Sequence, residues 1–382
     1  MKSGVLPDWR IKELIEKGVI KNADPELVST SGLDLRVGSD QWKLVGSFLP
    51  LPGQSIEEAL GSSEIVDHHS HESKFYVEHL QQYALKLEES LALTSTIRAR
   101  IFNKSGRGRI GVSLRGMTDG TTKFDKIDNG YVGNLYIEIS STCFPLTIHA
   151  GETAFPQVRF YEGNPQPIAG SDLEILLRDH PILTDDAGNP SYDTKEKTDM
   201  VRTGELTFTA DIPQGGLVAY RALRDRRTLD LAKKDHYDPE KYFEGIHKKN
   251  GERLVLIHPG EFMLINSGQH VRLPPNIAGE IAEYSGDAGD MKSHYAGLIN
   301  ASHGYDPEKK NTPSRIVFEI RARDVPIVIR HGQPLAKFML YEMIGPAKGR
   351  YMEKRSTNFD SLPSILPVMF KKYDQAEKGE TK

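Results

Sequence analysis

Cysteine is almost absent from this sequence, with Cys143 the single example in 382 residues. An intramolecular disulfide framework is therefore excluded. The first eight residues contain no apolar segment of the kind found in signal peptides, and no apolar run approaches the length of a membrane-spanning helix. We therefore expect a cytoplasmic protein without a membrane partner.

An excess of charge of one sign is also absent. The chain has 49 Lys and Arg against 53 Asp and Glu, a formal net charge of -4, and the two signs are interspersed. This is not the composition of a nucleic-acid-binding protein, so any anionic ligand has to be met by a local cluster of cations. A content of 38% hydrophobic and 27% charged residues is typical of a folded protein with a polar surface.

Several catalytic motifs are missing. Zinc-dependent nucleoside deaminases carry HxE and PCxxC signatures, but this chain has no HxE and too few cysteines for CxxC. Any deamination would therefore proceed without a zinc-activated water. The P-loop and the GxSxG elbow are absent as well. His68, His69 and His71 could bind a metal, but no second group of ligands stands nearby, so we expect an exposed polar loop and no metal site.

Glycine and proline, by contrast, are plentiful, with 34 and 22 residues. They separate short runs in which apolar and polar residues alternate, such as residues 33–37, 136–139 and 254–257. Short alternating runs with frequent turns predict a mainly β protein, either a barrel or a sandwich. The clearest helical pattern covers residues 8–18, where we expect Asp8 to be the N-cap.

The two halves of the sequence resemble each other. A block at residues 138–162 matches a block at residues 319–342 at an offset of about 180 residues, and the run 97–101 matches 277–281 at nearly the same offset. We therefore expect two mostly β units in tandem. We place the first unit at residues 1–182, a polar linker at residues 183–203, and the second unit with the C-terminal tail at residues 204–382.

The segment Lys104-Ser105-Gly106-Arg107-Gly108-Arg109 combines cations, a hydroxyl and glycines. Residues 106–111 match the dinucleotide pattern GxGxxG, but residues 112–120 lack a helical period, and such a site needs a helix after the glycines. Cations, a hydroxyl and accessible backbone N–H groups suit a phosphate chain. From composition alone, a phosphate site and a solvated basic turn are equally open.

Glu138 lies in the alternating run 134–140, which predicts a strand in which it shares a face with Tyr136. A single carboxylate in such a strand usually faces solvent, so these residues alone favour a surface position. Cys143 stands two residues before Pro145 in an apolar run, which favours a buried structural thiol over a nucleophile.

One set of motifs extends along almost the whole chain. The first half carries them at residues 4–8, 31–38, 47–50, 103–109, 124–125 and 130–138, and the second half at residues 294–297, 314–319 and 325–326. Together they resemble the long, two-repeat form of bacterial dCTP deaminase, in the dUTPase-like superfamily. The resemblance covers about residues 4 to 370 and implies tandem dUTPase-like β-barrel repeats, or β-clip folds, with a few short helices.

The resemblance implies hydrolytic, zinc-independent deamination of dCTP to dUTP and ammonia in pyrimidine deoxynucleotide metabolism. Glu138 would be the general acid–base group, Arg109 would orient the water or stabilise charge, and Ser105 would hydrogen-bond near the reacting centre. The substrate-binding residues would be Lys104, Gly106 and Arg107 for the phosphates, Asp128 for the sugar or nearby backbone, and Tyr131 for the base or sugar. Mg²⁺ would arrive with the triphosphate, and the protein would be a homo-oligomer.

The chain departs from the family pattern in three places. Gly106 stands where the family usually has a second serine, and the tail at residues 356–363 lacks the usual glutamines. The element at residues 294–303 lacks an Asp-Pro-Gly at the expected place. In addition, residues 284–290 contain two aspartates where the first half has its cations. We therefore expect the second repeat to be a structural partner that completes the site of the first, with Glu319 structural rather than catalytic.

Two other functions stay open. A dUTPase, or a bifunctional deaminase and dUTPase, would use an aspartate as the base for attack on phosphorus, and Asp125 or Asp128 would be the candidate. A catalytically silent protein of the same fold would bind the nucleotide without turnover.

Overall fold

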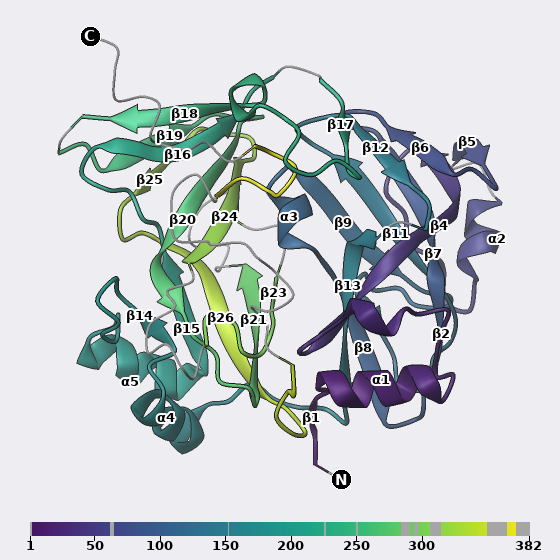
Figure 1. Cartoon of the computed structure of the whole chain (residues 1–382), viewed down its shortest axis with the longest axis horizontal. Helices are drawn as coiled ribbons and strands as arrows, with labels where there is room; N and C mark the ends of the chain where they lie inside the picture. The colour runs from purple at the N-terminus through teal and green to yellow at the C-terminus, as the bar shows by residue number, and fades with distance from the viewer. Residues whose placement is uncertain are drawn as a thin grey trace.

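Two lobes built mainly from β-strands lie side by side in the computed structural model (Figure 1). The first half of the chain forms the lobe at the right of the figure, and the second half forms the lobe at the left. The structure describes residues 2–61, 65–151, 153–224, 227–249, 251–283, 291–293, 297–305, 315–349 and 365–371. The mainly β fold that the sequence predicts is confirmed.

The first half contains these elements. They are β1 (Gly4–Val5), α1 (Asp8–Glu16), β2 (Ile20–Lys21), η1 (Pro25–Leu27), β3 (Val28–Ser29), β4 (Gly32–Leu44), α2 (Ile56–Leu60), β5 (Ile65–His69), β6 (Lys74–Val77), β7 (Gln82–Ala92), β8 (Ile97–Asn103), α3 (Ser105–Gly108), β9 (Val112–Met117), β10 (Lys126–Ile127), β11 (Val132–Ser141), β12 (Leu146–His149), β13 (Thr153–Glu162) and α4 (Gly170–Asp179).

The second half continues with these elements. They are β14 (Leu183–Thr184), α5 (Thr194–Thr203), β15 (Glu205–Thr209), β16 (Gly216–Ala222), β17 (Leu229–Asp230), η2 (Pro239–Lys241), β18 (Phe243–Lys248), β19 (Leu254–Ile257), β20 (Phe262–Val271), β21 (Ile277–Glu283), β22 (Met291–Lys292), β23 (Leu298–Ile299), β24 (Arg315–Ala322), β25 (Ile327–Arg330) and β26 (Pro334–Glu342). Within the described residues, no helix is long and apolar enough to cross a membrane.

The main sheet of the first half has β8, β13, β4, β7, β11 and β9 side by side in this order, each antiparallel to its neighbours. Alternation along the strands gives the sheet one apolar face. On β8, Ile97, Ala99 and Ile101 are buried in the core, whereas Arg98 and Arg100 between them are partly exposed. The alternating runs therefore form strands because each strand buries its apolar side chains on one face of the sheet.

The second half repeats the strand pairing of the first. β7 pairs with β11, β8 with β13, and β6 with β12; the matching pairs are β20 with β24, β21 with β26, and β19 with β25. Corresponding strands lie at the offset that the sequence shows. The internal repeat is therefore confirmed as a repeat of structure.

Helix α1 forms where the sequence predicts it, but the expected N-cap is wrong. Pro7 is the N-cap, and Asp8 lies in the first turn. The Asp8 carboxylate instead accepts hydrogen bonds from the backbone N–H groups of Lys348 at 3.0 Å and Gly349 at 2.7 Å. The Asp8 side chain therefore binds the second half of the chain instead of capping its own helix.

Residues 183–203, which the sequence suggests as a linker, contain β14 and α5. Helix α5 begins with a capping box, in which the side chains of Asp193 and Glu196 each accept a hydrogen bond from the other residue's backbone N–H. β14 pairs with β20 of the second half. The limits of the two units and of the linker stay a prediction.

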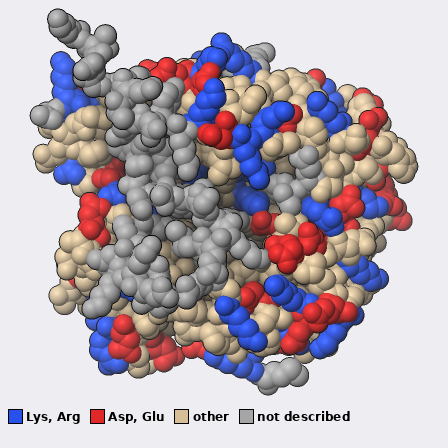
Figure 2. Space-filling model, viewed as in Figure 1, with Lys and Arg blue, Asp and Glu red and all other residues tan. Residues whose placement is uncertain are grey.

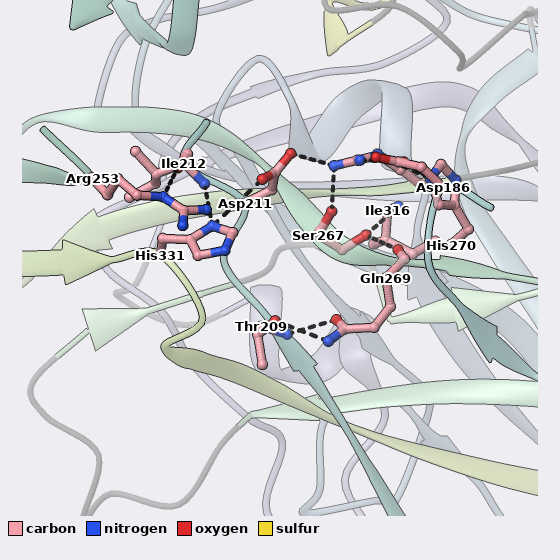
Figure 3. Close-up of polar contacts among 11 residues, drawn as sticks. Asp186, Thr209, Asp211, Ile212, Arg253, Ser267, Gln269, His270, Ile316 and His331 are labelled. Atoms are coloured by element: carbon pink, nitrogen blue, oxygen red, sulfur yellow. Dashed lines mark hydrogen bonds and ion pairs between the residues drawn. The ribbon is translucent and has the colours of Figure 1, made fainter. Parts of the chain in front are cut away.

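Asp186, between β14 and α5, belongs to a polar network in the second half (Figure 3). Its carboxylate lies 2.7 Å from Nε2 of His270 and accepts a hydrogen bond from Arg315 at 2.6 Å. Arg315 also pairs with Asp211, which lies 3.6 Å from Nδ1 of His331. Through these contacts Asp186 attaches this part of the chain to the second repeat.

A buried ion cluster joins the two repeats. Arg159 of β13 has no exposed surface and Glu280 of β21 is 2% exposed, and the nearest atoms of their charged groups are 3.5 Å apart. Arg100 of β8 donates a hydrogen bond to the other carboxylate oxygen at 2.9 Å. Arg159 also donates to the carbonyl oxygens of Gly279 at 2.8 Å and Ile299 at 2.9 Å. A buried charge is tolerated only with such partners, so the cluster fixes one repeat on the other.

Each half also covers the core of the other half. Helix α4, at the end of the first half, buries Leu173 and Leu177 in the core of the second. Residues 365–371, near the end of the chain, bury Ile365 and Phe370 in the core of the first. The two lobes therefore depend on each other for burial of apolar surface.

Replacing Arg159 by Met should lower the free energy of unfolding by roughly 3 kcal/mol or more, because Glu280 then stays buried with one cation fewer. Chemical denaturation measures the loss. Arg178→Met is the matched control: Arg178 pairs with Asp179 at the exposed surface of α4, so its removal should leave the midpoint unchanged. Equal losses in the two variants would contradict the assigned role of the cluster.

Candidate functional site

Glu138 is buried on β11, which lies between β7 and β9 in the main sheet, and 2% of its surface is exposed. It lies opposite Ala84 of β7 and Arg115 of β9. The surface position favoured by its residue type is wrong, because residues 45–61 fold over this face of the sheet. The shared face with Tyr136 is confirmed by the strand register and by the burial of that ring beneath the same residues.

The Glu138 carboxylate is held by hydrogen-bond donors from two directions. Oε2 accepts from the backbone N–H of Phe48 at 3.1 Å, and Oε1 accepts from Nε2 of Gln82 at 2.5 Å. The Ser47 side chain also bonds to it. Burial raises the pKa of Glu138, and these hydrogen bonds and the charge of Arg115 only partly oppose that effect. Such a carboxyl group is suited to accepting and releasing a proton.

Helix α2 ties the covering residues to the same strip of the sheet. The Tyr136 hydroxyl donates to Glu57 at 2.8 Å. The backbone N–H of Ile56 donates to the Asp119 carboxylate at 2.8 Å, and the N–H of Asp119 donates to the Tyr131 hydroxyl at 3.4 Å. The expected substrate residue Tyr131 is therefore linked to helix α2 through Asp119.

Tyr131 and Asp128 lie at the edge of this strip. Burial raises the pKa of Tyr131, whose hydroxyl donates to the carbonyl oxygen of Asn134 at 2.5 Å. Its backbone N–H donates to the carbonyl oxygen of Asp128 at 3.3 Å, and the Asp128 side chain is exposed. The structure therefore places Tyr131 and Asp128 together just before β11, seven residues or more along the chain from Glu138.

The basic segment forms α3, a single turn between β8 and β9. Lys104 is its N-cap, and the backbone N–H of Arg109 donates to the carbonyl oxygen of Ser105 at 3.0 Å. The chain then continues directly into a strand, so no helix follows the glycines. The expectation that residues 112–120 do not form a helix is confirmed.

The surroundings of α3 differ from residue to residue. Lys104 pairs with Asp34 of β4, and the guanidinium of Arg107 lies 5.8 Å from the centre of the Phe155 ring. No atom lies within 4 Å of the position that a side chain at Gly106 would take. Basic and acidic side chains are interspersed over the described part of the face in Figure 2, so a phosphate chain would have to be met by a local group of this kind.

Arg109 is buried, with 7% of its surface exposed. Its Nε and Nη2 donate to the Ser105 hydroxyl at 3.1 and 2.9 Å, and its Nη1 donates to the carbonyl oxygen of Ile365 at 3.1 Å. A residue of the C-terminal segment thus contacts a predicted catalytic residue of the first repeat.

Glu138 and Arg109 do not meet within one chain. Val112, three residues after Arg109, lies opposite Ser141, three residues along β11 from Glu138. At about 3.3 Å per residue, this is roughly 10 Å along the strand. Glu138 faces the covering residues, whereas Arg109 bonds to Ile365, which packs in the core on the other side of the sheet. The expected site residues therefore form two separate groups.

Four residues around the Glu138 carboxylate were not identified from the sequence. Ser47 and Phe48 belong to a motif that carries the family resemblance, so a signal for them was present. Gln82 and Arg115 become neighbours of the carboxylate only through strand register, which the sequence does not specify.

The other sequence candidates have structural roles. Cys143 is buried, which raises the pKa of its thiol to about 12, and its expected structural role is confirmed. His68 and His69 are exposed as expected but lie on β5 rather than in a loop, because they pair with β4. His68 stacks on Trp42, and His69 lies 3.1 Å from Asp67. The described ranges contain no group of three His, Cys, Asp or Glu that could hold a metal ion.

Glu319 of β24 occupies the position in the second repeat that corresponds to Glu138. It is 1% exposed and lies opposite Leu264 of β20. Residues 284–290, which carry the aspartates, and residues 356–363 of the tail lie outside the described residues. The expected difference between the two repeats therefore stays a prediction.

Two family models match the chain in succession. Residues 2–164 match the N-terminal domain of 2'-deoxycytidine 5'-triphosphate deaminase, and residues 185–365 match the C-terminal domain of the same family.

Individual proteins give the same result. A protein of Corynebacterium diphtheriae named "dCTP deaminase, dUMP-forming" is 29% identical over 171 residues, which cover 42% of this chain and 86% of that protein. One of the same name from Methanospirillum hungatei is 29% identical over 152 residues, with 38% and 76% covered. The crystal structure of 2'-deoxycytidine 5'-triphosphate deaminase from Agrobacterium tumefaciens matches with a TM-score of 0.80 and 29% identity, and covers 90% of this chain and 100% of that one.

Gly111, just after α3, should not tolerate a side chain. Its φ is +76°, and an added Cβ would overlap Cys143 and lie 2.8 Å from the Thr142 hydroxyl oxygen. Gly111→Ala should lower the free energy of unfolding by roughly 2–4 kcal/mol. Gly106→Ala is the control: no atom lies within 4 Å of the added Cβ, so the free energy of unfolding should change by no more than about 0.5 kcal/mol. Thermal and chemical denaturation compare the two variants, and a tolerated Gly111→Ala would contradict this geometry.

Proposed function

This chain belongs to the dCTP deaminase family, and we propose that it catalyses the hydrolytic deamination of dCTP to dUTP and ammonia without zinc. The observation that carries the proposal is the environment of Glu138. A buried carboxylate with a raised pKa is held by fixed hydrogen-bond donors on the strand where the family resemblance requires the acid–base group.

In the proposed reaction a water molecule adds to C4 of the cytosine while N3 takes up a proton. The proton of the new C4 hydroxyl group then passes to the amino group, which leaves as ammonia, so that C4 becomes a carbonyl carbon. Glu138 accepts the proton of the attacking water and returns it to the base. Its raised pKa assists the return step, and the Gln82 and Phe48 donors keep the carboxylate in one orientation.

Arg109 and Ser105 would act at the same centre. The guanidinium orients the water or stabilises the charge that develops during addition, and the Ser105 hydroxyl hydrogen-bonds beside it. The two side chains already bond to each other, so they present one preorganised polar group rather than two independent ones.

The triphosphate would bind at α3. Lys104 and Arg107 supply cations, and Gly106 leaves the backbone open to close approach. Asp128 and Tyr131 would contact the sugar and the base. Mg²⁺ would enter on the phosphates and neutralise part of their charge; it prefers phosphate oxygens and water, so it needs no protein cage of carboxylates.

The separation of Glu138 from Arg109 supports a homo-oligomer in which two copies of the chain form each site. The α3 segment of one copy would lie beside Glu138 of another, as neighbouring subunits do in this superfamily. Val45 and Leu51, on the residues that cover Glu138, are 73% and 69% exposed, which suits a surface that another copy covers.

A second candidate is a bifunctional enzyme that also releases pyrophosphate to give dUMP. The names of the curated relatives favour it. Asp125 and Asp128 are the candidates for its base. The Asp125 carboxylate already accepts a hydrogen bond from the N–H of Gly116 at 2.7 Å and lies 3.3 Å from Arg115, whereas Asp128 is exposed, so Asp128 is the better placed.

Incubation of the protein with dCTP and Mg²⁺ tests the proposal through two products. Ammonia without pyrophosphate supports the deaminase, ammonia with pyrophosphate supports the bifunctional enzyme, and binding of dCTP with neither product would contradict both.

In the same assay Glu138→Gln should lower kcat by about 10²- to 10⁴-fold, because it removes the proton-transfer group, while dCTP binding changes little. The matched control is Glu319→Gln, at the corresponding position of the second repeat, which should retain turnover. Full activity of the Glu138 variant would contradict the site assignment.

A further inference from the structure

The C-terminal segment, residues 365–371, reaches from the second repeat to the α3 segment of the first. The carbonyl oxygen of Ile365 accepts a hydrogen bond from Nη1 of Arg109 at 3.1 Å, across 256 residues of sequence. Both residues are buried, at 1% and 7% exposure. The other two guanidinium nitrogens donate to Ser105, so the group is held from opposite sides by a local and a distant partner.

We propose that residues 365–371, here called the strap, position Arg109 for catalysis, with Phe370 as the anchor that holds the strap in place. The proposal rests on the proposed function, in which Arg109 acts at the reacting centre. Phe370 does not touch the nucleotide in this account; it is a positioning residue that acts through Ile365.

Backbone hydrogen bonds fix residues 368–371 of the strap to the second repeat. The N–H groups of Asp235 and His236 donate to the carbonyl oxygens of Val368 and Met369, both at 2.9 Å. The strap in turn donates from the N–H of Lys371 to the second repeat at 2.9 Å. The strap therefore lies along residues 235–237 as a short parallel partner.

An aromatic cluster holds the end of the strap. The Phe370 ring is 3% exposed, and its centre lies 5.5 Å from the rings of Tyr242 and Phe243 and 6.2 Å from that of Tyr237. Phe144 of the first repeat packs on two of these rings, at 5.4 Å from Tyr242 and 5.5 Å from Phe243. Phe370 therefore packs in an aromatic cluster to which both repeats contribute side chains.

The residues that hold the strap are themselves attached to the first repeat. β17, a few residues before the aromatic cluster, pairs with β12 of the first repeat, and Asp230 lies 3.1 Å from Nε2 of His149. The position of the strap is therefore defined relative to α3 and not only relative to the second repeat.

This arrangement matters for the reaction because an arginine side chain has many rotamers. A catalytic group that is displaced by about 1 Å can lose roughly 100-fold in rate, and displacement of the strap would remove the hydrogen bond from Nη1 of Arg109 to Ile365. The strap gives the second repeat a specific task in the site of the first.

The test is a graded series at Phe370, with Leu, Val and Ala, assayed for ammonia release from dCTP. We expect Phe370→Ala to lower kcat roughly 10- to 100-fold while KM changes by no more than about threefold, and Phe370→Leu to retain most of the activity. Val368→Ala, a change at a strap residue that is 55% exposed, is the control and should leave kcat unchanged. The series stays informative if the Ala variant does not fold.

A second readout does not depend on turnover. Phenylglyoxal modifies accessible arginines, and peptide mass spectrometry reports the modification of Arg109. We expect Arg109 to be protected in the unaltered protein and labelled roughly tenfold faster in Phe370→Ala. Unchanged labelling, or a folded Phe370→Ala variant with unaltered kcat and only a lower Tm, would overturn the proposal.

The two readouts separate the strap from the proposed function. If the unaltered protein releases no ammonia, the proposed function fails, and the labelling of Arg109 alone then decides whether the strap positions this side chain. Loss of kcat together with faster labelling supports both.

Discussion

The buried contact between Arg159 and Glu280 is the constraint on which the rest of the structure depends. Two charges cannot be left unpaired inside a protein, so the two repeats have one favourable relative position. Arg100, which joins the same cluster, stands at the position of the first repeat that corresponds to Glu280 in the second. If the two repeats had identical sequences, the same charge would stand at both of these positions and the two groups would repel each other. The cluster therefore requires two repeats that differ here.

In this fixed position, the second repeat contributes more strands and core residues to the first repeat than the first contributes to the second. β12 of the first repeat has β6 on one edge and β17, from the second repeat, on the other, whereas β25 at the corresponding place pairs with β19 alone among the described strands. The C-terminal segment adds Ile365 and Phe370 to the core of the first repeat. This asymmetry agrees with a division in which the first repeat carries the α3 segment and Glu138, and the second supports them.

Local patterns were sufficient for much of this structure. The alternation of apolar and polar residues predicted the strands, and the offset of about 180 residues predicted the repeat. The set of motifs indicated the family. The burial of Glu138 was not predictable from its strand, because the cover comes from residues 45–61. The contacts of Asp8 with Lys348 and of Arg109 with Ile365 could not be predicted either, because each joins residues more than 250 positions apart in the sequence. The candidate site residues were proposed from the resemblance, and their separation into two groups became visible only in the structure.

The central claim is that each active site combines the α3 segment of one copy with Glu138 of another. Mixed oligomers of Glu138→Gln and Arg109→Ala, made by co-expression and purified through a different tag on each variant, test it directly. If sites are shared, mixed oligomers restore both groups in at least about one quarter of the sites, and ammonia release from dCTP recovers to that extent although each variant alone is inactive. Mixed oligomers as inactive as the separate variants would contradict the claim.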